Sequence, residues 1–368
     1  MRLHNSDHVL RIVKRLGPLS RTEIAKQSKL SLPTVGAVIN DLLLAGMVEE
    51  FGAGESTGGR KPLLVSFNPQ CGAVIGGNIG ATSARLVLAD MRGEWLVKRL
   101  VQFDGETHPK PLLQRVIEAA KKMCKEELGS KTPLLAVVIG APGMTDIKRG
   151  VVIEAANLDG WVNVPVGDIL EKKLGVPVIV DNDVNLAAVG EHWQGGGRGL
   201  HNFVFIMMGT GIGSGIVIDN KIYRGHRWHA GEISHLNLDF REWETNFGAA
   251  GYLEAHLSPK QQKQSRKLQH PQDTLNDEAL IRLGVAVANI ATIVDPEAII
   301  FGGRIAISQQ EMLSRVSEVA KKIAPNCPKI CLTELGEDAP LYGSIKIALN
   351  HAEESLHEVL LRKVWAAA

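Results

Sequence analysis

Residues 73–90 of the chain read AVIGGNIGATSARLVLAD, which is two apolar runs on either side of a glycine-rich turn. Residues 203–219, FVFIMMGTGIGSGIVID, repeat this plan. Each stretch predicts a strand, a hairpin and a second strand. Glycine turns let backbone amides converge on phosphate oxygens, so two such turns facing one cleft would hold a nucleotide tail between two lobes. Because the glycines lead into a strand instead of a helix, a Rossmann dinucleotide site is disfavoured.

The composition is that of a multidomain globular protein. The 368 residues are 45% hydrophobic and 22% charged, and such a chain can form two or three packed units. No apolar run is long enough to span a membrane and the first residues are polar, so we expect a cytoplasmic protein without a membrane partner. The cysteines are few and scattered, which predicts neither a disulfide framework nor a paired CxxC metal site.

The N-terminal residues carry the start and stop signals of three short helices. Apolar residues at helical spacing predict a first helix over 9–16. Ser20 and Glu23 have the spacing of a capping box, in which each side chain binds the backbone amide of the other residue. Ser31 can cap a third helix, which Gly46 then ends. This is the spacing of a helix-turn-helix.

Two short strands, 47–51 and 63–67, flank the turn-rich segment 52–62 and complete a wing. The first 70 residues have a net charge of +3 and the remainder −2, so a polyanion-binding surface is expected at the N-terminus. The third helix would enter a major groove, and the wing would meet phosphates or a minor groove. The alternative is a helical dimerisation module with a solvated basic loop. The residues expected to contact DNA are Arg21, Ser31, Thr34, Asn40, Arg60 and Lys61.

Further motifs follow along the chain: STGGRKP (56–62), GAPG (140–143), NLDGW (157–161), DNDVN (181–185), GE (190–191), GTGIG (209–213), GEISH (231–235), GAAGYLE (248–254) and FGGR (301–304). With these motifs in this order, the chain resembles over nearly its whole length the ROK family of repressors and sugar kinases. The resemblance implies a winged helix-turn-helix over residues 1–70, followed by an α/β, two-lobed, actin-like ATPase domain of the RNase H-like, sugar-kinase type. Its lobes would span 71–198 and 199–368, with a C-terminal helix returning to the first lobe.

The resemblance also implies a sugar site. By motif position its ligands would be Asn157, Asn182, Asp183, Glu232, His235 and Glu254. These residue types suit the task, because carboxylates and amides can each bind adjacent hydroxyl groups of a hexose. Two simpler readings stay open: Glu232 and His235 as a local surface pair, and Asn182-Asp183 as an Asx turn after a strand.

A nucleotide cleft is implied as well, in vestigial form. Its residues would be Gly80, Thr82, Gly209, Thr210, Gly211, Gly213, Gly302 and Gly303. Family kinases carry an aspartate in a DxGxT pattern at the first turn, where this chain has Asn78. A neutral carbonyl is a weaker ligand for the magnesium of ATP. Asp183 would be the catalytic base only if the protein were an active kinase, the one case in which ATP and Mg²⁺ are cofactors.

Many members bind a structural zinc through the histidine of GExxH and three cysteines. This chain has Thr245, Phe247 and Tyr252 at the cysteine positions, and none of them supplies a thiolate. His226 and His229 lie nearby, but tetrahedral zinc needs three or four convergent ligands. We therefore expect no zinc, with apolar packing of Phe247 and Tyr252 in its place.

These observations favour a sugar-responsive repressor of carbohydrate-metabolism genes that requires no cofactor. It would bind duplex operator DNA as a homodimer or homotetramer, because a palindromic operator demands two recognition helices in fixed relation. The effector would be a sugar or sugar phosphate. The alternatives are an ATP-dependent sugar kinase with a vestigial DNA module and a bifunctional protein.

Overall fold

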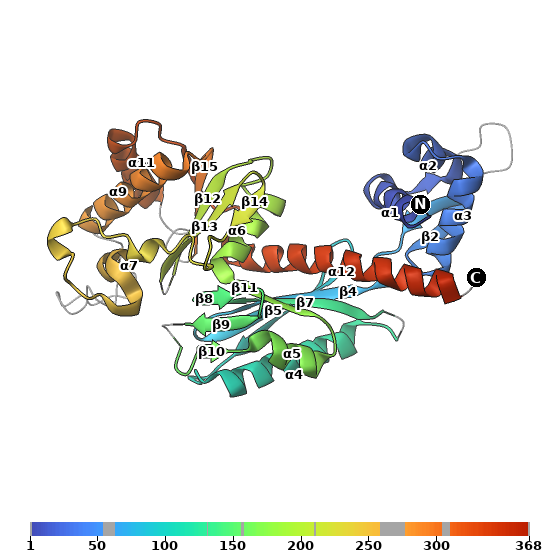
Figure 1. The fold of residues 1–368 in the computed structure, drawn as a ribbon, viewed down its shortest axis with the longest axis horizontal. Coiled ribbons are helices and arrows are strands. Elements are labelled where there is room, and N and C mark those ends of the chain that lie inside the picture. The colour runs from blue at the N-terminus through green and yellow to red at the C-terminus, as the bar shows by residue number, and fades with distance from the viewer. Residues whose placement is uncertain are drawn as a thin grey trace.

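The computed structural model describes residues 2–53, 63–130, 132–155, 158–209, 211–257, 277–303 and 310–366. Within these ranges the chain forms an N-terminal module, two sheets with helices on their faces, and a long C-terminal helix (Figure 1).

The N-terminal module is a winged helix-turn-helix. Its helices are α1 (Arg2–Leu16), α2 (Arg21–Ser28) and α3 (Leu32–Leu44), and its strands β1 (Leu19–Ser20), β2 (Val48–Ala53) and β3 (Leu63–Phe67) pair in the order β1-β3-β2. Ser20 and Glu23 form both halves of the predicted capping box at the start of α2. Ser31 caps α3 by accepting the amide of Thr34. The helix start signals that the sequence predicted are therefore formed by residues close together in the chain.

The two glycine-turn hairpins lie in two sheets of the same design. The first has the order β11-β7-β4-β5-β6, with β4 (Ala73–Ile79), β5 (Ser83–Asp90), β6 (Trp95–Gln102), β7 (Leu134–Ala141) and β11 (Val178–Asn182). The second has the order β14-β13-β12-β15-β16, with β12 (Phe203–Met208), β13 (Ile212–Ile218), β14 (Lys221–Tyr223), β15 (Ala298–Gly302) and β16 (Lys329–Leu332). In each, the first hairpin strand pairs antiparallel with the second and parallel with a later strand.

Helices cover both faces of each sheet. On the first sheet, α4 (Pro109–Glu127) and α5 (Val166–Leu174) pack on one face, and a small sheet of β8 (Met144–Asp146), β9 (Val151–Glu154) and β10 (Val162–Val164) joins that side. On the second sheet, α7 (Gly251–Leu257), α9 (Asp277–Val294) and α11 (Gln310–Ile323) cover one face, and α6 (Asp183–Gln194) covers the other. Alternate strand residues point to opposite cores, as the period of two requires.

Short 3₁₀ turns complete the described fold: η1 (Pro69–Cys71), η2 (Ile233–His235), η3 (Phe240–Glu242), η4 (Gly248–Ala250) and η5 (Gly336–Asp338). The predicted boundary at residue 70 falls in η1, and that at residue 198 falls between α6 and β12.

The C-terminal helix α12 (Ala339–Ala366) runs from the region between the sheets to the N-terminal module (Figure 1). It crosses α6 closely, because a methyl group added to Gly343 would lie 1.8 Å from the carbonyl oxygen of Leu186. Only glycine allows backbones to approach this closely. A similar addition at Gly190 would lie 2.1 Å from the carbonyl oxygen of Ala339.

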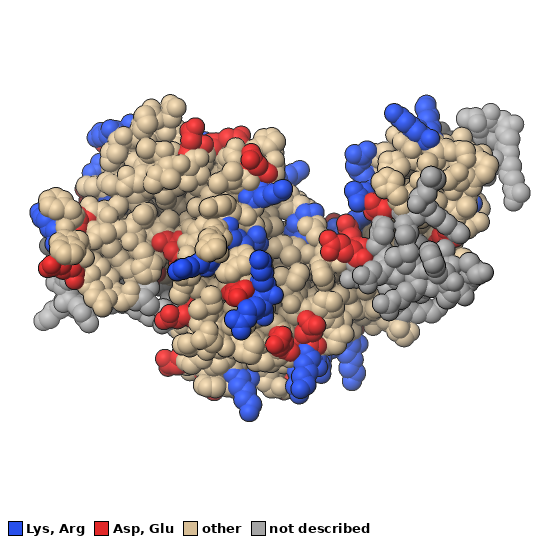
Figure 2. Space-filling view, in the orientation of Figure 1, with Lys and Arg blue, Asp and Glu red and all other residues tan. Residues whose placement is uncertain are grey.

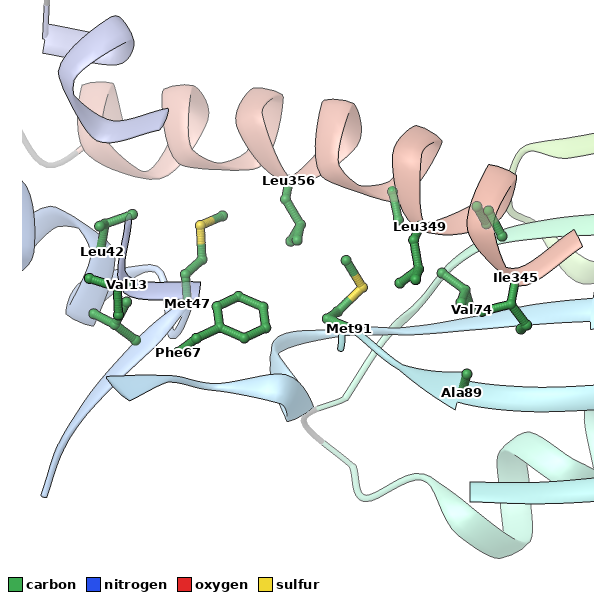
Figure 3. Packing of buried hydrophobic residues seen from close by; sticks show 14 of the residues in the cluster. Val13, Leu42, Met47, Phe67, Val74, Ala89, Met91, Ile345, Leu349 and Leu356 are labelled. Atoms are coloured by element: carbon green, nitrogen blue, oxygen red, sulfur yellow. The ribbon is translucent and has the colours of Figure 1, made fainter. Parts of the chain in front are cut away.

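One apolar core joins α12 to the N-terminal module and to the first sheet. Figure 3 shows Leu42 and Phe67 of the module and Val74 of β4 in the same cluster as Ile345 and Leu356 of α12. At the surface, Lys14 of α1 forms an ion pair with Glu353 of α12. The N-terminal module is thus attached to the body of the protein by a packed core in addition to the chain connection.

Candidate functional site

A cleft of about 970 Å³ lies between the two sheets, within the size range of small-molecule sites. Both glycine-turn hairpins line it: Gly80 and Thr82 come from the first sheet, and Gly211 and Gly213 from the second. The first residues of α12 line it too. The cleft therefore touches both lobes and the helix that leads to the N-terminal module.

The predicted site residues separate into three groups. Those on the cleft wall are Asn182, Asp183, Glu232, Glu254, Gly80, Thr82, Gly209, Gly211, Gly213 and Gly303. His235 is exposed and Gly302 lies under the ring of Phe205, and neither is part of the wall. Asn157 and Thr210, like Arg60 and Lys61 of the wing, lie outside the described residues.

Asn182 is held by the backbone. Its Oδ1 accepts hydrogen bonds from the amides of Val184 (2.9 Å) and Asn185 (3.1 Å), and so caps α6. Its Nδ2 donates to the carbonyl oxygen of Gly143 (2.9 Å). The simpler Asx reading thus describes the observed contacts of Asn182. One amide hydrogen is left for a ligand, so its predicted sugar contact can be a single donated bond.

Three carboxyl groups converge on the cleft and all have raised pKa values. Burial raises the pKa of Asp183 to about 7, and the nearby charge of Glu232 adds to this. Burial also raises the pKa values of Glu232 and Glu254, although His235 opposes the shift at both. Carboxyl groups in such surroundings gain from donors that replace water, and sugar hydroxyl groups are donors of this kind.

Glu254 also connects α7 to the second glycine turn. Its Oε2 accepts a hydrogen bond from the amide of Ile212 (3.0 Å). A methyl group at Gly211 would lie 2.5 Å from the same oxygen, so a larger residue there would displace the carboxylate from the amide of Ile212.

The first turn bears no acidic residue. Its Asn78 is 8% exposed, and the Oδ1 of this residue is buried without a hydrogen-bond partner. All side chains from Asn78 through Ser83 are uncharged. Magnesium bound to phosphates is usually held by carboxylate oxygens, so these residues do not fit a magnesium nucleotide well.

The sequence did not single out Asp181 as a site residue, and the structure shows that it connects the two lobes. Its buried carboxylate accepts from Arg224 Nη2 at 2.6 Å, an ion pair that joins β11 of the first sheet to the loop after β14 of the second. The residues are far apart in sequence, so no local signal could have paired them. Trp228, in the same loop, lines the cleft and was also missed.

Aromatic packing occupies the region where the resemblance would place zinc-binding cysteines. The rings of Phe247 and Tyr252 lie 5.3 Å apart at 84°, and His256 lies 4.2 Å from Tyr252. Edge-to-face contacts of this kind stabilise a segment without a metal. Among the described residues, no group of three or more His, Cys, Asp or Glu side chains could hold a metal ion.

On the N-terminal module, the predicted DNA contacts form a small polar network. Arg21 Nη2 donates to Asn40 Oδ1 (3.0 Å) and pairs with Glu50 (2.9 Å). The hydroxyl groups of Ser31 and Thr34 lie 2.8 Å apart. Figure 2 shows Lys and Arg side chains along the edge of the module formed by α1 and α2. None of the described helices is long and apolar enough to cross a membrane.

Comparisons with known proteins agree with this geometry. The xylose repressor of Caldicellulosiruptor bescii is 29% identical over 332 residues, covering 82% of this chain and 83% of the repressor. The solved structure of a ROK family transcriptional regulator, a homologue of the Escherichia coli MLC protein, matches with a TM-score of 0.76 at 21% identity and covers 99% of this chain and 98% of its own.

A ROK hexokinase from Thermus thermophilus matches with a TM-score of 0.66 at 26% identity, covering 77% of this chain and 99% of the kinase. The model of the ROK family matches residues 74–351, well over half of the sequence. The chain therefore belongs to the ROK family.

Proposed function

We propose that this protein is a sugar-responsive transcriptional repressor of carbohydrate-metabolism genes. The observation that carries the proposal is the position of α12, whose first turn lines the cleft and whose later turns share one core with the winged helix-turn-helix. A ligand in the cleft and DNA on the module therefore act on the same packed element. The relatives named as repressors support this reading.

The proposed DNA-binding surface consists of α3 and the wing. Thr34 and Asn40 would read base edges, with Arg21 orienting the amide of Asn40, while Arg60 and Lys61 contact the backbone or minor groove. A homodimer or homotetramer would present two such helices to a palindromic operator. Such a protein acts in the cytoplasm, where the DNA is.

The proposed sugar site is built from the carboxyl groups of the cleft. Asp183, Glu232 and Glu254 would accept sugar hydroxyl groups, with one further donor from Asn182. His235, whose charge acts to lower the pKa values of the two glutamates, would join them as a ligand by its place in the motif. Asn157 would join them by its place in the motif. Such directional bonds distinguish one sugar from another more sharply than apolar contact does.

The test is DNA binding by fluorescence anisotropy, with duplexes selected by the protein from a random pool and with D-xylose, D-glucose, N-acetylglucosamine and their phosphates as effectors. We expect one of them to change DNA affinity. Glu232→Ala should weaken sugar binding by roughly 1.5–3 kcal/mol and move the response to correspondingly higher sugar concentrations, while DNA affinity without sugar is kept. Arg60→Ala should weaken DNA binding and flatten its salt dependence. Sugar-insensitive DNA binding across the panel would contradict the proposal.

The second candidate is an ATP-dependent sugar kinase. It is favoured by the Thermus thermophilus hexokinase and by Asp183, whose pKa of about 7 suits a general base. Asn78 and the lack of an acidic residue in the first turn argue against it, so we propose that no cofactor is required. We also propose that zinc is absent, because Phe247 and Tyr252 pack together where the family's cysteines would stand. A coupled ADP-release assay with free sugars decides the matter: turnover of about one per second or faster would establish the kinase.

A further inference from the structure

Trp228 has a backbone conformation that tryptophan rarely adopts. Its φ of 65° lies in the left-handed region, where a bulky side chain meets the following carbonyl group. Apart from one lysine, the other described non-glycine residues with positive φ are all asparagine or aspartate, the types that tolerate this region best. They are Lys29, Asp104, Asn163, Asp219, Asn220 and Asp295. Strained residues of this kind gather at functional sites, because they persist only where the surroundings fix them.

The surroundings of Trp228 do fix it. The loop between β14 and η2 is closed by a hydrogen bond from the amide of Ala230 to the carbonyl oxygen of Arg224 (3.2 Å). The amide and hydroxyl of Ser214 both donate to the carbonyl oxygen of Gly231, at 2.9 and 3.0 Å. The strand β13 thus clamps the loop, and Trp228 is held at the cleft.

The indole lies between the two lobes. Trp228 is half-buried and lines the cleft together with Pro142 and Gly143 of the first lobe. Lys148, in the turn between β8 and β9, places its Nζ 5.8 Å from the ring centroid, within cation–π range. Glu232, one of the cleft carboxyl groups, follows Trp228 by four residues on the same loop.

We propose that Trp228 is a specificity-determining wall of the sugar site, on which the indole ring packs against the C–H face of a pyranose. The inference rests on the proposed function, since it names the class of sugar that the cleft takes. Carboxyl groups bind the hydroxyl edge of a sugar, and an aromatic plane covers the apolar face that these groups cannot serve. The combination fits a neutral pyranose with equatorial hydroxyl groups, whose ring hydrogens form continuous apolar faces.

Substitution of Trp228 by glycine distinguishes a role in sugar binding from a purely structural role. Trp228→Gly removes the indole and at the same time relieves the left-handed backbone, so the variant should unfold at a temperature no lower than the unmodified protein. Its affinity for sugar should fall by about tenfold. Trp228→Phe keeps an aromatic plane and should lose less. The control is Trp243, which is 74% exposed and away from the cleft wall.

Titration calorimetry with D-xylose and D-glucose measures the affinities, and sugar-induced quenching of tryptophan fluorescence supplies the second readout. We expect the quenching to disappear in Trp228→Phe and to remain in Trp243→Phe. Equal affinities of the unmodified protein and Trp228→Gly, or quenching that survives in Trp228→Phe, would overturn the inference alone. If the unmodified protein bound none of the sugars and sugar phosphates of the anisotropy panel, the proposed function itself would be overturned.

Discussion

Asp183→Asn is expected to stabilise the ligand-free protein above neutral pH while weakening its affinity for sugar. The carboxyl group lies in the first turn of α6, half-buried on the cleft wall, and burial raises its pKa from 3.8 to about 7. Asparagine has the same shape, and its Oδ1 can still accept the amide of Val184, which Asp183 binds at 2.9 Å. The substitution therefore removes the titratable charge and little else.

The sign of the pH dependence follows from the raised pKa. The folded protein holds the proton of Asp183 more tightly than the unfolded chain does, so this group favours folding most below about pH 4. Its contribution to stability is lost as the pH rises towards 7. Each unit of pKa shift is worth about 1.4 kcal/mol, which gives a ceiling of about 4 kcal/mol. Because the side chain is only half-buried and solvent screens it, we expect about half of this, or ~2 kcal/mol, at pH 8.

Thermal denaturation at pH 5 and pH 8 without sugar tests this prediction. A gain of ~2 kcal/mol corresponds to an increase in Tm on the order of 4–8 °C at pH 8, with a smaller gain at pH 5. Asp181→Asn is the matched control, because it leaves Arg224 without its buried partner and should lower the Tm. Calorimetry should show weaker sugar binding by Asp183→Asn. A lower Tm for this variant at pH 8, or a gain independent of pH, would refute the reasoning.

Four further predictions concern other parts of the molecule. Leu356→Ala, in the core shared by α12 and the N-terminal module, should cost about 2–4 kcal/mol and reduce the effect of sugar on DNA binding, as measured by denaturation and anisotropy. Gly343→Ala should destabilise the protein by ~3 kcal/mol or more through the clash with Leu186, and a native-like Tm would contradict this. EDTA should leave the Tm unchanged, whereas a fall would reveal a structural metal. Asn78→Asp should raise any trace ADP release from ATP and sugar, and Asp183→Asn should abolish it.

Local signals in the sequence were sufficient for much of the fold. The capping box of Ser20 and Glu23 and the cap at Ser31 involve residues three apart, so they can be predicted without knowledge of any tertiary contact. The repeated glycine hairpin likewise predicted two sheets of the same design, because its period and turn chemistry are local. Residues 73–90 and 203–219 indeed form β4–β5 and β12–β13.

The geometry of the site depended on contacts that the sequence does not display. One side-chain N–H of Asn182 donates to the carbonyl oxygen of Gly143, which comes from a different strand end. Asp181 finds its partner in the opposite lobe, and the loop that carries Trp228 is held by hydrogen bonds from Ser214 of β13. A motif can place such residues near a cleft, but their hydrogen bonds and backbone angles follow from tertiary packing.

The raised pKa values and the position of α12 together explain how sugar could act on DNA binding. Asp183 begins α6, between the lobes, while Glu232 and Glu254 belong to the second lobe, so hydroxyl donors that satisfy all three gain most when the lobes approach. A shift of α6 must carry α12 with it, because Gly343 leaves no space between the two backbones. The far end of α12 is packed into the core of the winged helix. On the proposed function, a sugar would need no contact with the N-terminal module: a difference in the burial of the three carboxyl groups between two arrangements of the lobes would bias the position of the module through α12.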